Sequence, residues 1–432
     1  MIPDLRKKIL FTLLIIVVFR IGVAIPVPFL NMDALAGLMA NITGSGSMLE
    51  YLNTLSGGAF ENATLFAMSV TPYINASIIM QLLTVAIPPL ERMAKEGEEG
   101  RKKIATITRY ATVVLGLIQG TAYYFYLRGS SYDGTPILMY QAGKSAWFSA
   151  IVIILAFTAG TAMMMWLGEQ INQKGIGNGI SILLFAGIVS RMPHTIGQLW
   201  AYVQAAIEAP SQFGQYYAFV PLFIVLFLAV IWVIIFMNDA ERRIPVQYAK
   251  RVVGRKMYGG QSSHLPIKVG LSGVMPIIFA SSILSIPSTI NLFVSPTGFW
   301  KSFLDAFSSG GWLYSILYFL LILMFAYFYV NIQYNPVEMA NNLRQNNGTI
   351  PGIRPGKPTS DFIKKILSKI TLVGALFLAL IALLPIIFGA LTGMHNMQLG
   401  GTSLIIMVGV ALETVKQMES QMMMRHYKGF LD

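Results

Sequence analysis

Long apolar runs, separated by shorter polar segments, occupy most of the chain. A helix needs about 20 residues to cross a bilayer. Ten runs approach or exceed that length, near residues 9–27, 64–88, 104–127, 146–167, 178–197, 217–237, 271–292, 312–331, 367–389 and 399–418. The first is too long for the core of a signal peptide and lacks a small-residue cleavage site, so we expect it to be retained. The pattern predicts an all-α polytopic membrane protein with ten transmembrane helices.

Two of these runs contain the same proline-led sequence. "TPYINASIIM" (71–80) and "MPIIFASSIL" (275–284) align on Pro72 and Pro276 and share Ile, Ala, Ser and Ile downstream. They belong to the second and seventh runs, which are five runs apart. Because five is an odd number, the second half would cross the membrane in the opposite orientation to the first. Inverted repeats with broken helices at their interface mark a pathway near the membrane midplane. We therefore expect two halves, 1–197 and 198–432; a chance match between two similar membrane helices is the alternative.

The distribution of basic residues predicts the orientation. The chain has 432 residues, 55% hydrophobic and only 12% charged, whereas a soluble domain carries about 25% charged residues. If the N-terminus lies in the cytoplasm, all but five of the 31 Lys and Arg residues fall on the cytoplasmic side, the exceptions being Arg20, Arg128, Lys144, Arg191 and Lys301. Since cytoplasmic loops are enriched in Lys and Arg, both termini are predicted to be cytoplasmic.

Two cytoplasmic segments, 239–270 and 332–366, are far longer than a connection between helices requires. Both carry an excess of basic residues, and topology alone explains most of the positive charge of the chain. Their length exceeds what topology needs. We therefore predict that they form a docking surface for an acidic partner or for ribosomal RNA.

Candidate catalytic chemistry is sparse. The chain has no cysteine, so neither a disulfide framework nor a thiolate metal site is expected. "GIRPGKPTS" (352–360) lacks the glycine spacing of a phosphate-binding loop, and Pro358 follows its lysine. The few ionisable residues near run ends include Arg20 and Arg191, which are expected to extend to the membrane interface. We predict no enzymatic activity and no cofactor; an inverted-repeat secondary solute transporter, which normally binds its driving ions inside the membrane, remains the alternative.

Seven motifs in order connect the chain to a known family. They are "TPYINASIIMQLL" (71–83), "EGEEGRKK" (96–103), "WLGEQI" (166–171), "GIGNGISILLFAGIV" (175–189), "QSSHLPIKV" (261–269), "IPGIRPGKPT" (350–359) and "GGTSL" (400–404). On these the chain resembles the SecY family, the channel-forming subunit of the bacterial Sec protein translocase. The resemblance covers essentially the whole chain. It implies ten helices in two inverted pseudo-symmetric halves that form an hourglass pore.

The resemblance also implies roles for individual residues. A constriction of aliphatic side chains would consist of Val70, Ile74, Ile180, Leu184, Ile278 and Ile406. A lateral gate, where the two proline-led helices face each other, would include Pro72, Ser77, Pro276, Ser281 and Ser282. A movable external plug near 50–62 would include Leu55, Ser56, Gly57 and Gly58, and two adjacent glycines disfavour a long stable helix there. Contacts with a motor or ribosome would involve Arg354, Lys357, Arg251, Lys250 and Arg255.

The implied function is that of a passive protein-conducting channel. It would pass unfolded secretory polypeptides across the bacterial plasma membrane and release transmembrane segments sideways into the lipid bilayer. The implied partners are the membrane subunits SecE and SecG, the motor ATPase SecA, the ribosome and the signal sequences of substrates.

Overall fold

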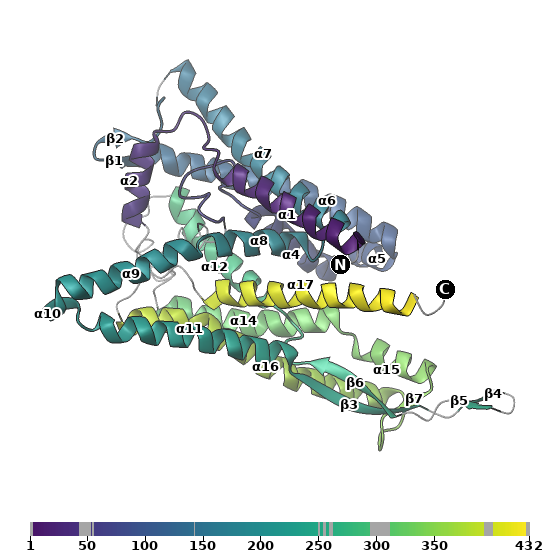
Figure 1. Cartoon of the computed structure of the whole chain (residues 1–432). Helices are drawn as coiled ribbons and strands as arrows, with labels where there is room; N and C mark the ends of the chain where they lie inside the picture. The colour runs from purple at the N-terminus through teal and green to yellow at the C-terminus, as the bar shows by residue number, and fades with distance from the viewer. Residues whose placement is uncertain are drawn as a thin grey trace.

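The computed structural model describes residues 3–42, 53, 56–141, 143–248, 251–253, 256–258, 262–293, 312–392 and 401–428. Most of these residues are helical, and helices from the first part of the chain pack mainly with one another (Figure 1). This first group comprises α1 (Pro3–Val23), α2 (Met32–Ile42), α4 (Thr71–Ala86), α5 (Pro88–Lys95), α6 (Glu98–Gly129), α7 (Lys144–Lys174) and α8 (Gly179–Ser190). A short hairpin joins α6 to α7 and consists of β1 (Ser131–Tyr132) and β2 (Thr135–Pro136).

The second group comes from the remainder of the chain. Two helices lead into it, α9 (Met192–Glu208) and the short α10 (Pro210–Phe213). The group itself comprises α11 (Tyr216–Asp239), α12 (Met275–Phe293), α14 (Trp312–Gln333), α15 (Pro336–Gln345), α16 (Lys357–Thr392) and α17 (Gly401–Lys428). Both chain ends lie at the same end of the molecule, toward the right in Figure 1. This placement agrees with an even number of crossings.

The two proline-led runs begin as helices at their prolines. Both α4 and α12 start one residue before the proline, at Thr71 and Met275. Proline suits the first turn of a helix because its missing N–H would have no partner there. The predicted second span, 64–88, therefore starts too early: Thr64 forms a bridge with Pro26, residues 65–70 form turns, and Ser69 has a φ of 52° that a right-handed helix does not accommodate. At its other end, α4 stops just before Pro88. The next helix, α5, begins at Pro88 and is bent by 101° relative to α4.

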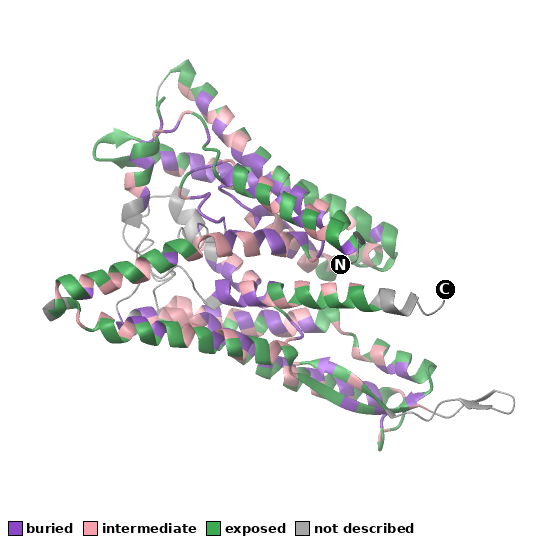
Figure 2. Ribbon diagram, viewed as in Figure 1, coloured by how far each residue is buried: buried purple, intermediate pink, exposed green. Residues whose placement is uncertain are grey.

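Predicted and observed elements differ elsewhere in detail. The fifth run, 178–197, is divided into α8 and α9 at Arg191, which is followed shortly by Pro193. By length and composition, five helices of the described chain could cross a membrane, and the bent pair α4–α5 could form a sixth. The number of ten therefore stays a prediction. The exterior is apolar: on α11, Val225, Leu228 and Trp232 are each more than half exposed, as lipid-facing side chains are (Figure 2).

The segments 239–270 and 332–366, expected as loops, contain a small antiparallel sheet. Its central strand β3 (Glu241–Tyr248) pairs with β6 (Ser262–Lys268) and β7 (Gly348–Thr349), and a separate hairpin is formed by β4 (Arg251–Val253) and β5 (Lys256–Tyr258). Ile244 and Val246 are buried while their neighbours are exposed, the alternation typical of a sheet with one covered face. Their cluster also contains Ile267 of β6, Leu343 of α15 and Ile363 of α16. The sheet thus has a hydrophobic core of its own.

Candidate functional site

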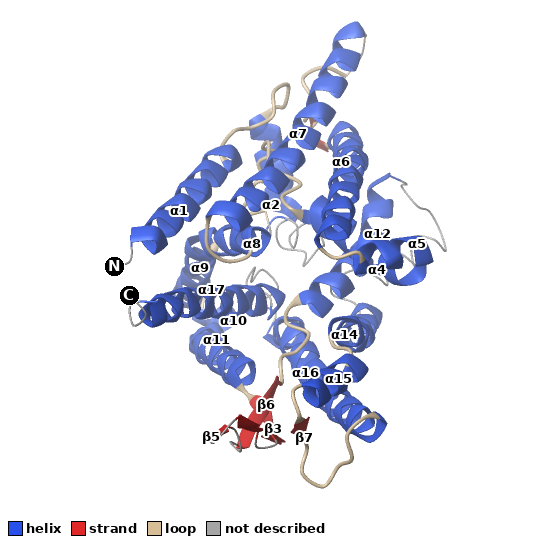
Figure 3. Cartoon of the chain, turned by 90° about the vertical axis from the view of Figure 1, so that its right-hand side faces the viewer, coloured by secondary structure: helices blue, strands red, loops and turns tan. Residues whose placement is uncertain are grey.

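Four helices meet at the centre of the molecule. α8 packs against α17, and α4 contacts α12, so each contact joins an element of the first group to one of the second (Figure 3). The six side chains predicted to form the constriction all lie in one apolar cluster at this meeting point. Val70, Leu184 and Ile406 are at most 3% exposed, and the other three, Ile74, Ile180 and Ile278, are partly buried against them. Aliphatic side chains from all four helices, together with Val70 at the end of the turns before α4, therefore pack together at the centre.

Local geometry explains how α8 reaches this position. The side chain of Asn178 caps its first turn by accepting hydrogen bonds from the N–H groups of Ile180 and Ser181. A Cβ atom on Gly179 would lie 1.9 Å from the carbonyl oxygen of Gly168 on α7, so only glycine permits this approach. Close backbone contact through small residues is the usual way in which membrane helices pack. It places Ile180 and Leu184 of α8 within the central cluster.

The segment predicted as the plug lies against this cluster. Residues 56–63 form turns, and Ser56, Gly57 and Gly58 are buried. Both glycines have positive φ angles, 66° and 91°, a region that other residues adopt only with strain. Ala59 is fully buried in the same cluster as the six constriction residues. Leu55, the remaining predicted plug residue, lies outside the described residues.

Polar contacts of this segment involve two arginines. Arg20 and Arg191 were expected to extend to the membrane interface, and in the structure both guanidinium groups contact this segment. Arg20 Nη1 lies 3.3 Å from the Gly57 carbonyl oxygen, and Arg191 Nη1 lies 3.1 Å from Glu61 Oε2. Glu61 was not identified from the sequence. The available signal was that Arg20, Arg191 and Glu61 all fall on the side predicted to be poor in basic residues.

The predicted gate residues lie on the contacting pair α4 and α12. Pro72 and Pro276 are both buried in the first turns of these helices. Ser281 is buried and donates a hydrogen bond from its hydroxyl group to the carbonyl oxygen of Ile278, three residues earlier. Ser77 and Ser282 are half-buried. All five predicted gate residues therefore lie on the two helices that contact each other across the two groups.

The predicted docking residues lie beside the sheet. Arg354 is exposed on a loop between β7 and α16, and Ile350 and Ile353, which precede it, pack into the core beneath the sheet. Gly352 and Gly356 have positive φ angles, which hold the turn around the arginine. Lys357, also exposed, begins α16. Arg251 lies in β4, whereas Lys250 and Arg255 lie outside the described residues.

The core beneath the sheet has one partly buried tyrosine at its edge. Tyr334, which packs against this core, follows α14 directly. Burial raises the pKa of its phenol above the ordinary value, because the low-dielectric surroundings disfavour the charged form. A phenol is neutral at physiological pH even without this shift, so Tyr334 adds no charge to the surface around Arg354.

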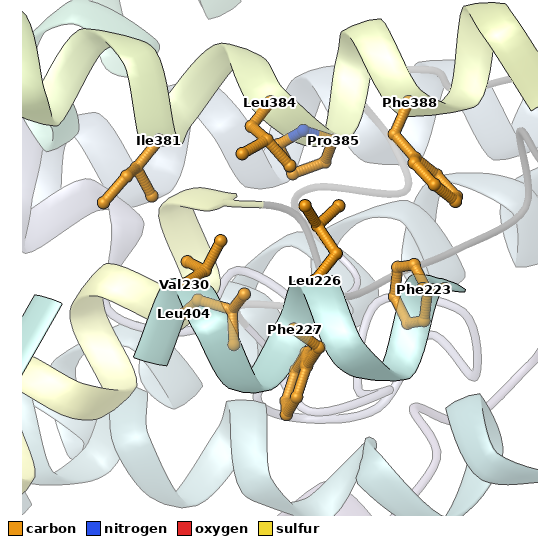
Figure 4. A pocket seen from close by; sticks show the side chains of 9 residues that line it. All are labelled: Phe223, Leu226, Phe227, Val230, Ile381, Leu384, Pro385, Phe388 and Leu404. Atoms are coloured by element: carbon orange, nitrogen blue, oxygen red, sulfur yellow. The ribbon is translucent and has the colours of Figure 1, made fainter. Parts of the chain in front are cut away.

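A separate hollow lies between α11, α16 and α17 (Figure 4). It is lined by apolar side chains alone, Phe223, Leu226, Phe227, Val230, Ile381, Leu384, Pro385, Phe388 and Leu404, and its volume is about 20 Å³. One water would fit by size, but a buried water needs two or more polar partners. This hollow is a packing defect beside Pro385. Among the described residues, no group of three His, Asp or Glu side chains could hold a metal ion.

The fold defines the class of the protein: it has the fold of protein-conducting membrane channels. A solved protein-conducting channel superimposes with a TM-score of 0.63 at 18% identity, over 96% of this chain and 92% of that chain. Sec61 from the canine ribosome–channel complex gives a TM-score of 0.58 at 17% identity, over 96% and 92%. At such identities the likeness concerns the fold.

Sequence comparison identifies the family. The family model for SecY matches residues 64–415. The protein translocase subunit SecY of Bacillus subtilis is 45% identical over 432 residues, covering 100% of this chain and 97% of the relative. The same subunit of Thermotoga maritima is 44% identical over 434 residues, covering 100% and 96%. The chain belongs to the SecY family of multi-pass membrane proteins.

Proposed function

We propose that the chain forms the central channel of a bacterial Sec translocase. It passes unfolded secretory polypeptides across the membrane and releases transmembrane segments sideways into lipid. The observation that carries the proposal is the convergence of Val70, Ile74, Ile180, Leu184, Ile278 and Ile406 in one central cluster. These residues come from four separate stretches of the chain, and all have aliphatic side chains.

An aliphatic constriction suits the transport of polypeptides. A narrow apolar passage excludes water and gives ions nothing to replace their hydration shell, so the resting channel stays closed to them. Flexible aliphatic side chains yield to many different passing residues without binding any of them. In the resting state the segment around Ser56–Ala59 covers the constriction, and a translocating chain displaces it.

The contact between α4 and α12 supports a lateral exit. These helices carry Pro72 and Pro276, and they join the two helix groups at one side of the centre. Separating them would connect the constriction with the surrounding lipid. The hydroxyl groups of Ser77, Ser281 and Ser282 along this contact make it more easily wetted than a purely aliphatic one. A sufficiently apolar substrate segment would leave through this opening.

The channel is passive and acquires its partners through separate surfaces. We infer that it lies in the bacterial plasma membrane with cytoplasmic termini, associates with SecE and SecG, and receives substrates from SecA or the ribosome. The exposed Arg354 and Lys357, beside the basic segment 239–270, supply a surface complementary to acidic proteins or RNA. The SecY family is not an enzyme family, and we expect no enzymatic activity.

The proposal is tested by reconstitution of the chain, with the subunits that co-purify from its native membrane, into vesicles. SecA, ATP and a signal-bearing unfolded substrate are added, and protease-protected substrate is measured. We expect ATP-dependent protection together with no saturable uptake of small solutes. Saturable solute uptake without polypeptide protection would instead support the rival interpretation, a secondary solute transporter.

Orientation is tested separately by reporter fusions. Fusions after Lys256 and Arg354 should report the cytoplasm, and fusions after Lys144 and Lys301 the exterior. A cytoplasmic signal at Lys301 would contradict the ten-span topology without bearing on the constriction.

A further inference from the structure

Two arginines hold the plug segment from different elements. Arg20 lies in the last turn of α1, and Arg191 lies between α8 and α9. Arg20 Nη1 donates hydrogen bonds to Ser190 Oγ at 2.9 Å and to the Gly57 carbonyl oxygen at 3.3 Å. Arg191 Nη1 donates to Glu61 Oε2 at 3.1 Å. The two ends of the segment 57–61 are thus each held by a guanidinium group.

The carboxylate of Glu61 is fixed on its other side as well. Asn53 Nδ2 donates to the same Oε2 atom at 2.8 Å, and Asn53 Oδ1 accepts from the Glu61 N–H at 3.0 Å. The side chains of Arg191 and Glu61 are 11% and 27% exposed. An ion pair withdrawn from water to this extent is weakly screened by salt. It is therefore a stronger restraint than an exposed pair.

The glycine pair matches this arrangement. A Cβ atom on Gly57 would lie 3.2 Å from Arg20 Nη1, and one on Gly58 would lie 3.0 Å from Arg191 Nη1. A larger residue at either position would displace the guanidinium group that contacts the segment. Both residues also have positive φ angles, which glycine adopts without strain and larger residues do not. The sequence Gly57-Gly58 thus leaves room for the two guanidinium groups.

From these contacts we propose that Arg20 and Arg191, with Glu61 as counter-charge, form a latch that positions the plug segment and sets the stability of the closed channel. This inference rests on the proposed function. The latch has a specific consequence, because its anchors all belong to the first half of the chain. A third anchor, the Tyr123 hydroxyl group on α6, donates to the Phe60 carbonyl oxygen at 2.7 Å, and it also lies in that half.

The plug segment meets the second half of the chain through apolar packing. Ala59 packs in the cluster that includes Ile406 of α17 and Ile278 of α12. Separating α4 from α12 therefore removes apolar packing around the segment but leaves the charged latch intact. Opening of the lateral gate and release of the plug are two distinct steps, and the latch governs the second.

The test is the resting ion conductance of the complete channel complex in planar bilayers. Arg191→Gln and Glu61→Gln should each raise the conductance about tenfold, since removing one partner of a partly buried pair leaves the other uncompensated. The exchange Arg191→Glu with Glu61→Arg should restore much of the closure. Arg20→Lys should leak less than Arg20→Gln because the charge remains. Arg109→Gln and Glu169→Gln, which break a 2.6 Å pair between α6 and α7, should leave the conductance unchanged.

The outcomes separate the latch from the channel. Wild-type conductance in both Arg191→Gln and Glu61→Gln, while Ile406→Asn leaks, would overturn the latch and leave the proposed function standing. A leak that the charge exchange does not reduce would also overturn it, because the effect would then reflect general loss of structure. If Ile406→Asn is tight as well and no substrate is protected, the proposed function itself fails.

Discussion

The centre of the molecule and the sheet beside α15 both bury aliphatic side chains, but they assemble them differently. The central cluster draws its residues from α1, α4, α8, α12 and α17, elements spread across the chain. The core under the sheet comes from two stretches, 239–271 and 330–367, that form strands and helices around it. The first is a meeting of two helix groups, and the second is a small local fold.

This difference has a physical origin. In water, burying Ile244 and Val246 is favourable by itself, so the sheet closes wherever its strands meet. Between membrane helices no such driving force exists, and association depends on close packing and polar contacts. Around the centre, a glycine contact between α7 and α8 and the Arg191–Glu61 pair accordingly fix the elements of the first half to one another. The centre is thus suited to opening, and the sheet to presenting a fixed surface.

The largest effect should follow from a polar substitution at the centre. Ile406→Asn places an amide in the constriction and lowers the barrier to wetting. We expect ion conductance to rise by more than tenfold and signal-defective substrates to be secreted. Ile405→Asn is the matched control, because Ile405 is equally buried but faces the other cluster. It should reduce stability without a leak; equal leaks from both variants would contradict the assignment of the ring.

The next effect concerns the surface beside the sheet. Arg354→Glu reverses an exposed charge, and like-charge contact with an acidic partner costs several kcal/mol. SecA-driven protection of substrate should fall at least tenfold, while the melting temperature and resting conductance of the complex stay unchanged. Arg344→Glu, an exposed reversal at the end of α15, should have little effect. Full translocation by the Arg354→Glu channel would limit this residue to a role in topology.

An intermediate effect should separate the two regions most clearly. Ile244→Ala removes a buried side chain from the core of the sheet, a change that costs about 2–5 kcal/mol. Amide exchange should accelerate in residues 239–270 and motor-driven translocation should decline, whereas conductance should not change. Gln247→Ala on the exposed side of the same strand serves as the control. Increased conductance in the Ile244→Ala channel would show that the two regions are coupled.

The smallest effect is expected for Lys357→Glu. The lysine lies three residues from Arg354 and is likewise exposed, but it lacks the planar fork that binds carboxylates or phosphates in two-point contacts. Translocation should fall in the same direction as for Arg354→Glu and by a smaller factor. The two variants are compared at several salt concentrations. A larger defect for Lys357→Glu would place the main contact on α16.

Sequence patterns carried much of the architecture. Apolar runs located the helices, but the spans predicted from them, 64–88 and 271–292, start before α4 and α12, which begin at Thr71 and Met275 beside the prolines of the two motifs. The resemblance selected six aliphatic residues that the structure places in one cluster. The sheet was missed because its alternation at Ile244 and Val246 is short and lies among basic residues. The turns at 65–70 were missed because they are as apolar as the helix that follows.

By itself, the sequence determined which segments suit lipid and which suit water, because that choice depends on the side chains of each segment alone. It also determined helix starts at proline and turns at glycine, which follow from local backbone geometry. Only the tertiary structure decided that Arg20 and Arg191 turn toward Gly57 and Glu61. The guanidinium group of an arginine at the end of a membrane helix can be satisfied either by water or by a carboxylate, so the residue type alone does not decide between them. The outcome depends on which distant segment folds beside it.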